Sequence, residues 1–302
     1  MTKKQLFTIL EPKTWSASII PVLIGTLYST YRVGNFRLDL FIAVLFSAVG
    51  VQCFANVIND YSDYISGLDT RETVYDREGS ILVFDDISLI QVKKLMACLV
   101  ICTLFPAVYL IFHRGLVVAV IGIIGFLVAY LYSAGPLPIS KTFLGELFSG
   151  LTMGGLITWL AYYVQAGYID ENIILISIPL IIYIGSILLT NGICDIEKDQ
   201  GTRVTIPILM GRERSIDILK FAYIMMYVFV FLSIVLKSLP VSMFLIFLSI
   251  PLVVKKLKFI AVENITLKNR SKIMENSVLS GIIFFFFYII IILGEILRRE
   301  FL

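Results

Sequence analysis

Apolar residues along this chain gather into long runs that are separated by shorter polar segments. A membrane-spanning helix needs about 20 mainly apolar residues. Such runs predict nine spans, at residues 15–31, 39–58, 95–112, 116–133, 143–165, 172–193, 216–236, 238–254 and 276–297. The pattern therefore predicts an all-α, polytopic membrane protein, with residues 1–302 forming a single transmembrane domain.

The overall composition agrees with this prediction. Hydrophobic residues make up 58% of the chain and charged residues 16%, whereas a soluble domain averages roughly 45–50% apolar and about 25% charged residues. The basic start of the chain has neither a continuous apolar core nor a cleavage site, so we expect no removed signal peptide. One histidine and four dispersed cysteines argue against a haem site, a histidine-based triad, a zinc site and a disulfide framework.

Basic residues are unevenly divided between the two sets of loops. The N-terminus and every second loop carry about three times as many lysines and arginines as the opposite set. This bias predicts a cytoplasmic N-terminus and an outside C-terminus in the inner or plasma membrane. The three long loops, 59–94, 194–215 and 255–275, all lie on the cytoplasmic side, where we therefore expect the chemistry.

Two acidic clusters follow predicted spans. The first, after the second span, comprises Asn56, Asn59, Asp60, Asp63 and Asp69. The second, after the sixth span, comprises Asn191, Asp195 and Asp199. Carboxylates beside hydrocarbon are costly, and they indicate function by default. Four crossings separate the clusters, so both should open on one face. The recurrence suggests a parallel repeat of spans 1–4 and 5–8 around a central cavity, with the ninth span at the C-terminus.

The residue types in these clusters suit a hard cation. On a helix, side chains three and four positions apart share a face, so each cluster forms an oxygen-rich ridge. Gly67 allows a turn that brings Asp69 back toward the first ridge. Mg²⁺ commonly takes one or two carboxylates together with substrate phosphates. Four basic residues near the same loops are candidates to hold a diphosphate: Arg71, Arg77, Lys141 and Arg203.

These motifs resemble those of a known family. The run from Asn59 through Asp60 and Asp63 to Asp69 resembles the first aspartate-rich motif of the UbiA superfamily of intramembrane prenyltransferases, and the second cluster matches its second motif. Further similar stretches are 12–25, 77–80, 132–138, 145–146, 162–167 and 205–211. The resemblance covers roughly residues 11–212 and is greatest for the MenA branch, which prenylates 1,4-dihydroxy-2-naphthoate in menaquinone synthesis.

The resemblance implies a UbiA-like fold and an enzyme that uses Mg²⁺. This enzyme would transfer a polyprenyl group from a polyprenyl diphosphate to an aromatic acceptor, 1,4-dihydroxy-2-naphthoate in the MenA branch. It assigns catalysis and metal binding to Asp60, Asp63, Asp195 and Asp199. It assigns substrate binding to Asn56, Asn59, Asp69, Arg71, Arg77, Lys141, Asn191 and Arg203. The lipid bilayer is the expected environment, and no nucleic-acid partner is expected.

Some alternatives stay open at this level. The second motif of the family commonly reads Asn-Asn-x-Arg-Asp, whereas this chain has Gly192 and Cys194 at the second and fourth positions. A different aromatic acceptor is therefore an alternative, and the prenyl length is open. A cation-coupled secondary transporter is the alternative from another class, since carboxylates within a membrane can bind cations. The motif of CDP-alcohol phosphotransferases is absent from the sequence.

Overall fold

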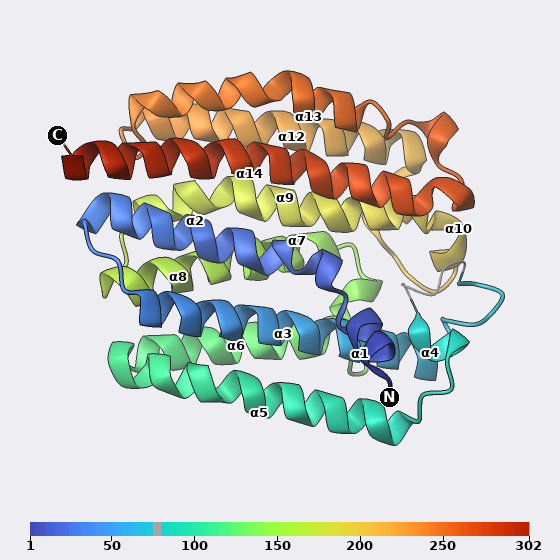
Figure 1. Ribbon diagram of the computed structural model, residues 1–302. Coiled ribbons are helices and arrows are strands. Elements are labelled where there is room, and N and C mark those ends of the chain that lie inside the picture. The colour runs from blue at the N-terminus through green and yellow to red at the C-terminus, as the bar shows by residue number, and fades with distance from the viewer. Residues whose placement is uncertain (75–79, 302) are drawn as a thin grey trace.

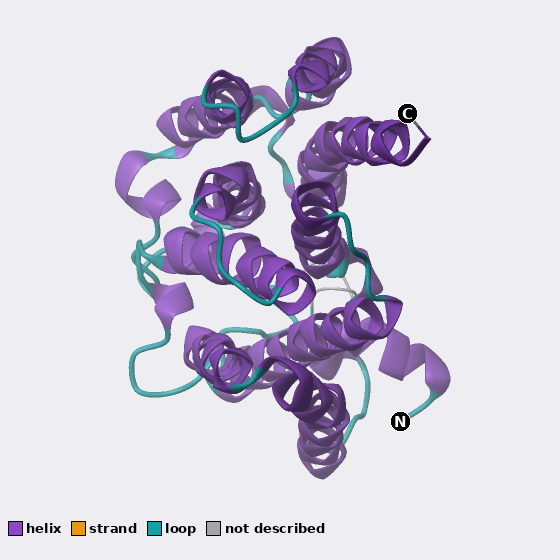
Figure 2. Cartoon of the chain, turned by 90° about the vertical axis from the view of Figure 1, so that its left-hand side faces the viewer, coloured by secondary structure: helices purple, strands orange, loops and turns teal. Residues whose placement is uncertain are grey.

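The computed structural model describes residues 1–74 and 80–301, and within them every regular element is a helix. The long helices run side by side as a bundle (Figure 1). They are α2 (Ser16–Val33), α3 (Leu38–Ile65), α5 (Leu89–Arg114), α6 (Leu116–Ser133), α9 (Asn172–Cys194), α12 (Arg212–Val235) and α14 (Arg270–Phe301). Figure 2 shows the bundle from one end, with many of these helices seen nearly along their axes.

Two further rods of the bundle are composite. One joins α7 (Gly145–Ser149), the π-helical η3 (Gly150–Leu156) and α8 (Ile157–Ala166). The other joins the 3₁₀ segment η4 (Val241–Ser249) to α13 (Ile250–Leu257). Short elements cap the bundle: α1 (Lys3–Leu10), η1 (Pro12–Thr14), α4 (Ile81–Phe84), η2 (Ile139–Lys141), α10 (Ile196–Asp199), α11 (Ile206–Met210), η5 (Val262–Asn264) and η6 (Leu267–Asn269).

Within the described ranges, seven helical segments are long and apolar enough to cross a membrane. These seven support an integral, multi-pass membrane protein. The predicted spans at 15–31 and 238–254 correspond to α2 and to η4 with α13. The first of these carries several Ser, Thr and Tyr residues, and the second is divided into two short pieces, so neither is counted among the seven. The count of nine remains a prediction.

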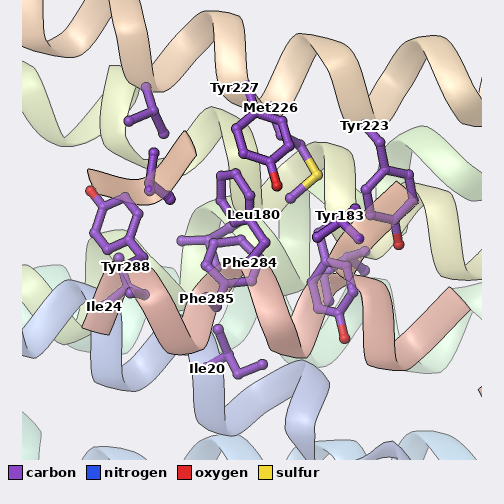
Figure 3. Packing of buried hydrophobic residues seen from close by; sticks show 14 of the residues in the cluster. Ile20, Ile24, Leu180, Tyr183, Tyr223, Met226, Tyr227, Phe284, Phe285 and Tyr288 are labelled. Carbon is purple, nitrogen blue, oxygen red and sulfur yellow. The ribbon is translucent and has the colours of Figure 1, made fainter. Parts of the chain in front are cut away.

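The apolar core lies between α2, α9, α12 and α14. Figure 3 shows Tyr183 of α9 beside Phe284 and Phe285 of α14, with Tyr227 of α12 above them. The rings of Tyr183 and Phe285 are 5.3 Å apart, a distance typical of favourable aromatic pairs. Helices within a membrane associate through such close packing, because lipid tails are as apolar as the helix surfaces.

Small residues set the closest helix contacts. A Cβ atom on Gly154 would lie 2.5 Å from the backbone of Leu180, so η3 can approach α9 only because this position is glycine. By contrast, only 6% of the apolar window of α5 is buried inside the bundle, against 56% for α9. Helix α5 therefore lies at the periphery (Figure 1), and the rods around α9 form the rigid centre that supports the site.

Both acidic clusters lie at the same end of the bundle. Helices α3 and α9 end there, near α10, the beginning of α14 and the N-terminus, whereas the C-terminus lies at the other end (Figure 1). This arrangement agrees with the prediction, made from the number of crossings, that the clusters share one face.

Candidate active site

The first acidic cluster lies on the last turns of α3 and on the loop that follows. Helix α3 continues to Ile65, beyond the predicted apolar run, and both Asp60 and Asp63 are buried. Gly67 then adopts a positive φ of 73°, and the backbone N–H of Asp69 donates to the Asp63 carbonyl at 3.1 Å. The expected turn is thus present, and it returns a buried Asp69 to the cluster.

The second acidic cluster lies where α9 gives way to α10. Helix α9 ends at Cys194, and Asp195 has a backbone conformation outside the helical region. The N–H of Asp199 still donates to the Asp195 carbonyl at 2.9 Å, which keeps the two carboxylates one turn apart. Asp199 is only 3% exposed. The C-terminus of a membrane-buried helix therefore presents two carboxylates at a fixed spacing.

Arg203 joins the two clusters. Its guanidinium lies 3.0 Å from Oδ2 of Asp63 and 3.5 Å from Oδ1 of Asp199. Burial lowers the pKa of Arg203, but the two carboxylates outweigh burial and raise it. Burial raises the pKa of Asp199 to about 6, although Arg203 opposes this shift. The residues of both halves of the chain therefore form one electrostatic unit.

A second link between the clusters comes from Lys198. Its ammonium lies 2.7 Å from Oδ1 of Asp69, and the hydroxyl of Ser80 donates to the other carboxylate oxygen. Because Lys198 lies on α10 and Asp69 follows α3, this ion pair also connects the two halves. Lys198 is not among the residues predicted for the site, although it stands between Asp195 and Asp199 in the second cluster.

Arg270 fixes the second cluster from the first residue of α14. It contacts both carboxylate oxygens of Asp195, at 2.7 and 2.8 Å, and donates to the Asn191 amide oxygen at 2.8 Å. Such two-pronged arginine–carboxylate pairs are among the strongest polar contacts. Sequence reasoning missed this residue too. The only signal was its place in the basic loop before the last span.

The remaining predicted residues occupy varied positions. Asn59 accepts a hydrogen bond from Ser133 at 2.9 Å. Asn56 donates instead to Leu10 and Thr14, so it holds the N-terminal segment against α3. Lys141 contributes its carbonyl, which accepts from the Val204 N–H at 2.9 Å. Arg71 is exposed in the loop after α3, and Arg77 lies outside the described residues.

The donor set of the site fits a magnesium ion. In the part of the chain that the structure describes, no three or more His, Cys, Asp or Glu side chains gather tightly enough to hold a metal by themselves. Mg²⁺ does not require that, since it usually combines one or two carboxylates with substrate phosphates. Asp60 is buried, and no described residue forms a hydrogen bond or ion pair with its carboxylate. A buried carboxylate without a charged partner is costly to ionise, and a bound cation would offset that cost.

The chain is similar in sequence to known proteins of one family. The UbiA prenyltransferase family matches residues 18–293. The 1,4-dihydroxy-2-naphthoate octaprenyltransferase of Bacillus subtilis is 35% identical over 254 residues, which are 84% of this chain and 81% of that protein. The 2-carboxy-1,4-naphthoquinone phytyltransferase of a Synechocystis strain is 24% identical, over 86% of this chain and 83% of its own length.

Solved structures share the fold. The apo UbiA homologue of Aeropyrum pernix superposes with a TM-score of 0.69 at 17% identity, over 92% of this chain and 98% of that one. A UbiA homologue of Archaeoglobus fulgidus, solved with DMAPP and Mg²⁺, gives a TM-score of 0.63 at 17% identity, over 93% and 99% of the two chains. The fold, the paired acidic clusters and the sequence similarity agree: the chain belongs to the UbiA prenyltransferase family.

Proposed function

We propose that this protein transfers a polyprenyl group from a polyprenyl diphosphate to 1,4-dihydroxy-2-naphthoate, a step of menaquinone synthesis, with Mg²⁺ as cofactor. The acceptor is supported by the similarity to the Bacillus subtilis octaprenyltransferase, whose name states it. The metal and the diphosphate are supported by the Archaeoglobus fulgidus homologues, which were solved with Mg²⁺ and either DMAPP or GPP. Family membership disfavours the alternative of a secondary transporter.

The observation that carries this proposal is the bridge formed by Arg203. One cation contacts a carboxylate of each cluster, at 3.0 and 3.5 Å, so residues far apart in sequence act at one place. A diphosphate needs such a mixture of anionic metal ligands and fixed positive charge. A site made of a single cluster, or of carboxylates alone, would repel it.

In this proposal Asp60, Asp63, Asp195 and Asp199 would hold one or two Mg²⁺ ions together with the substrate diphosphate, and the bound metal would neutralise charge that develops on the leaving diphosphate. Arg203 and Lys198 supply further positive charge to the diphosphate oxygens. The bond between the allylic carbon and the diphosphate oxygen breaks, with its electron pair leaving on the diphosphate. The ring carbon that bears the carboxylate then bonds to the allylic carbon, and that carboxylate leaves as CO₂, so that the electron pair of the broken C–C bond restores the aromatic ring.

The orientation in the membrane is part of the proposal. The excess of lysine and arginine in the loops at the end that carries the site supports a cytoplasmic N-terminus and a cytoplasmic site. With the site at one end of the bundle, the diphosphate would stay at the polar end, and the prenyl tail would extend along the apolar surfaces of the helices.

An assay with purified protein tests the function. The protein is given Mg²⁺, polyprenyl diphosphates of several lengths, and a panel of acceptors that includes 1,4-dihydroxy-2-naphthoate and 4-hydroxybenzoate. We expect prenylated product and CO₂ with the naphthoate, and no product after EDTA removes the metal. Product with 4-hydroxybenzoate alone would overturn the acceptor, and transfer that continues without metal would overturn the mechanism.

A further inference from the structure

A small, partly open cavity lies beside the bridge formed by Arg203. Its volume is about 40 Å³, and its lining includes Tyr132, Glu146, Asn191, Gly192, Asp199, Arg203 and Thr205. These residues come from α6, α7, α9, α10 and the segment between α10 and α11. Since a water-sized group needs roughly 10–15 Å³ on this measure, the cavity has room for about three oxygen atoms.

Three buried polar atoms at this cavity have no hydrogen-bond partner. They are Oε2 of Glu146, Nε of Arg203 and Oγ1 of Thr205. Thr205 is only 7% exposed, and the 3.5 Å between Arg203 Nε and Asp199 is an ion pair rather than a hydrogen bond. Buried polar groups in proteins are almost always paired, so three orphans around one cavity indicate a ligand.

The chemistry of the three atoms restricts that ligand. The guanidinium N–H can only donate, an ionised Glu146 can only accept, and the Thr205 hydroxyl can donate. Together they match a carboxylate, which would accept from Arg203 and Thr205, next to a hydroxyl, which would donate to Glu146.

We propose that this cavity recognises the adjacent hydroxyl and carboxylate of the aromatic acceptor, with Thr205, Arg203 and Glu146 as its specificity-determining residues. This inference rests on the proposed prenyl transfer and extends it to acceptor choice. It predicts a preference for aromatic acids that carry a hydroxyl ortho to the carboxylate. An acid with the two groups on opposite sides of the ring cannot place both in so small a space.

Backbone and side-chain contacts hold the residues that line the cavity in position. The Lys141 carbonyl accepts from the Val204 N–H at 2.9 Å, which fixes the segment between Arg203 and Thr205 against η2. A Cβ atom on Gly192 would lie 3.0 Å from Cγ of Pro207, tighter than an ordinary contact. The glycine at this position of the second motif therefore lets α11 close on α9 beside the cavity.

A diphosphate oxygen is a poorer occupant than the acceptor. Diphosphate presents only acceptor oxygens, so it would leave Oε2 of Glu146 unpaired, whereas the aromatic acceptor offers a hydroxyl that can donate to it. Ordered water is the other possible occupant, because water satisfies donors and acceptors alike. The experiment must separate recognition of the acceptor from a cavity that only holds water.

The test measures binding of three naphthalene ligands to the full-length protein, in Mg²⁺ and without prenyl diphosphate, by titration calorimetry. The ligands are 1-hydroxy-2-naphthoate, 2-naphthoate and 1-naphthol. We expect the wild type to bind the first at least tenfold more tightly than either of the others, since each lacks one hydrogen-bonding group. Thr205→Val should weaken the two carboxylates about tenfold and leave 1-naphthol unchanged.

Glu146→Gln should show the opposite pattern. It should weaken the two hydroxyl-bearing ligands several-fold, because a charge-assisted bond is lost, and leave 2-naphthoate unchanged. Thr205→Ser, which keeps the hydroxyl, should retain wild-type affinities. Thr152→Val is the matched control, because the Thr152 hydroxyl donates to the Phe148 carbonyl within its own rod and should not affect binding.

Two results would overturn the inference. One is equal affinity of the wild type for the three ligands, and the other is an equal loss for all three in both variants; each would mean that the cavity holds only water. The transfer assay distinguishes a failure of this inference from a failure of the proposed prenyl transfer. A protein without the ortho preference that still prenylates another acceptor with Mg²⁺ would contradict this inference while the transfer reaction stands.

Discussion

In the first acidic cluster, Asp63 and Asp69 pair with cations from the other half of the chain, whereas Asp195 of the second cluster is fixed by Arg270 at the start of the last helix. Arg203 and Lys198 each reach a single carboxylate oxygen of the first cluster. Arg270 donates hydrogen bonds to both carboxylate oxygens of Asp195 and to the amide oxygen of Asn191. Single contacts exchange more readily than two-pronged ones. We therefore expect the two motifs to differ in role: the first should exchange its partners when metal and substrate bind, and Asp195 of the second should stay in place.

The largest effect should come from the carboxylate that no described residue pairs. Asp60→Asn removes a buried negative charge that we assign to the metal, and we expect prenyl transfer at saturating Mg²⁺ to fall about 10³-fold or more, since metal contributions reach several kcal/mol. Asp217→Asn, an exposed aspartate on α12, is the matched control. Activity of Asp60→Asn within a few-fold of the wild type would contradict the assignment.

The next effect tests the bridge between the clusters. Arg203→Gln leaves the buried carboxylates of Asp63 and Asp199 without their cation, and breaking a buried pair in this way costs about 3 kcal/mol. We expect a lower Tm together with a transfer rate reduced about 100-fold. Because the metal binds the folded state, Mg²⁺ should recover part of the lost Tm. An equal loss of Tm with and without Mg²⁺ would show that the metal does not share this site.

A smaller effect is expected when the contact between Arg270 and the second acidic cluster is weakened. Arg270→Lys keeps the positive charge but loses the planar fork that holds Asp195 and Asn191. We expect kcat/KM to fall about tenfold, with kcat as the main component, because misplaced ligands weaken the transition state more than substrate binding. A wild-type rate in this variant would mean that Arg270 only balances charge.

The smallest effect should come from Lys198. Its ion pair with Asp69 is partly exposed, with 21% of the lysine side chain accessible, and ion pairs near water contribute roughly 1 kcal/mol or less. Lys198→Met should raise the KM for polyprenyl diphosphate about threefold and leave the KM for the acceptor unchanged. An effect confined to the acceptor would place Lys198 elsewhere in the mechanism.

Much of the fold could be predicted from the sequence, because a helix that crosses a lipid bilayer needs a long run of apolar residues. Seven of the predicted spans coincide with helices that are long and apolar enough to cross a membrane. The start of α5 lies at Leu89 rather than 95, because Ser88 caps it by accepting from the Gln91 N–H. The predicted span at 238–254 is divided at Ile250, directly before Pro251, which lacks an N–H donor.

The pairing within the site was less predictable. The carboxylates and the turn at Gly67 follow from local pattern, and the structure agrees with both. The choice of Arg203, Lys198 and Arg270 as partners depends on how α10 and α14 pack against α3 and α9, which no local pattern contains. Asn56 shows the converse case, since its spacing suggested a ligand while its amide holds the N-terminal segment.

In the proposed mechanism the two acidic clusters form one diphosphate site. A double-variant cycle tests it most directly, by measuring Mg²⁺-dependent binding of a non-cleavable polyprenyl diphosphate analogue to wild type, Asp60→Asn, Asp195→Asn and the double variant. If the clusters act as one unit, the affinity of the double variant for the analogue should be at most about threefold lower than that of whichever single variant binds it less tightly. Losses that multiply, so that the double variant shows the product of the single effects, would mean two independent sites and would contradict the account.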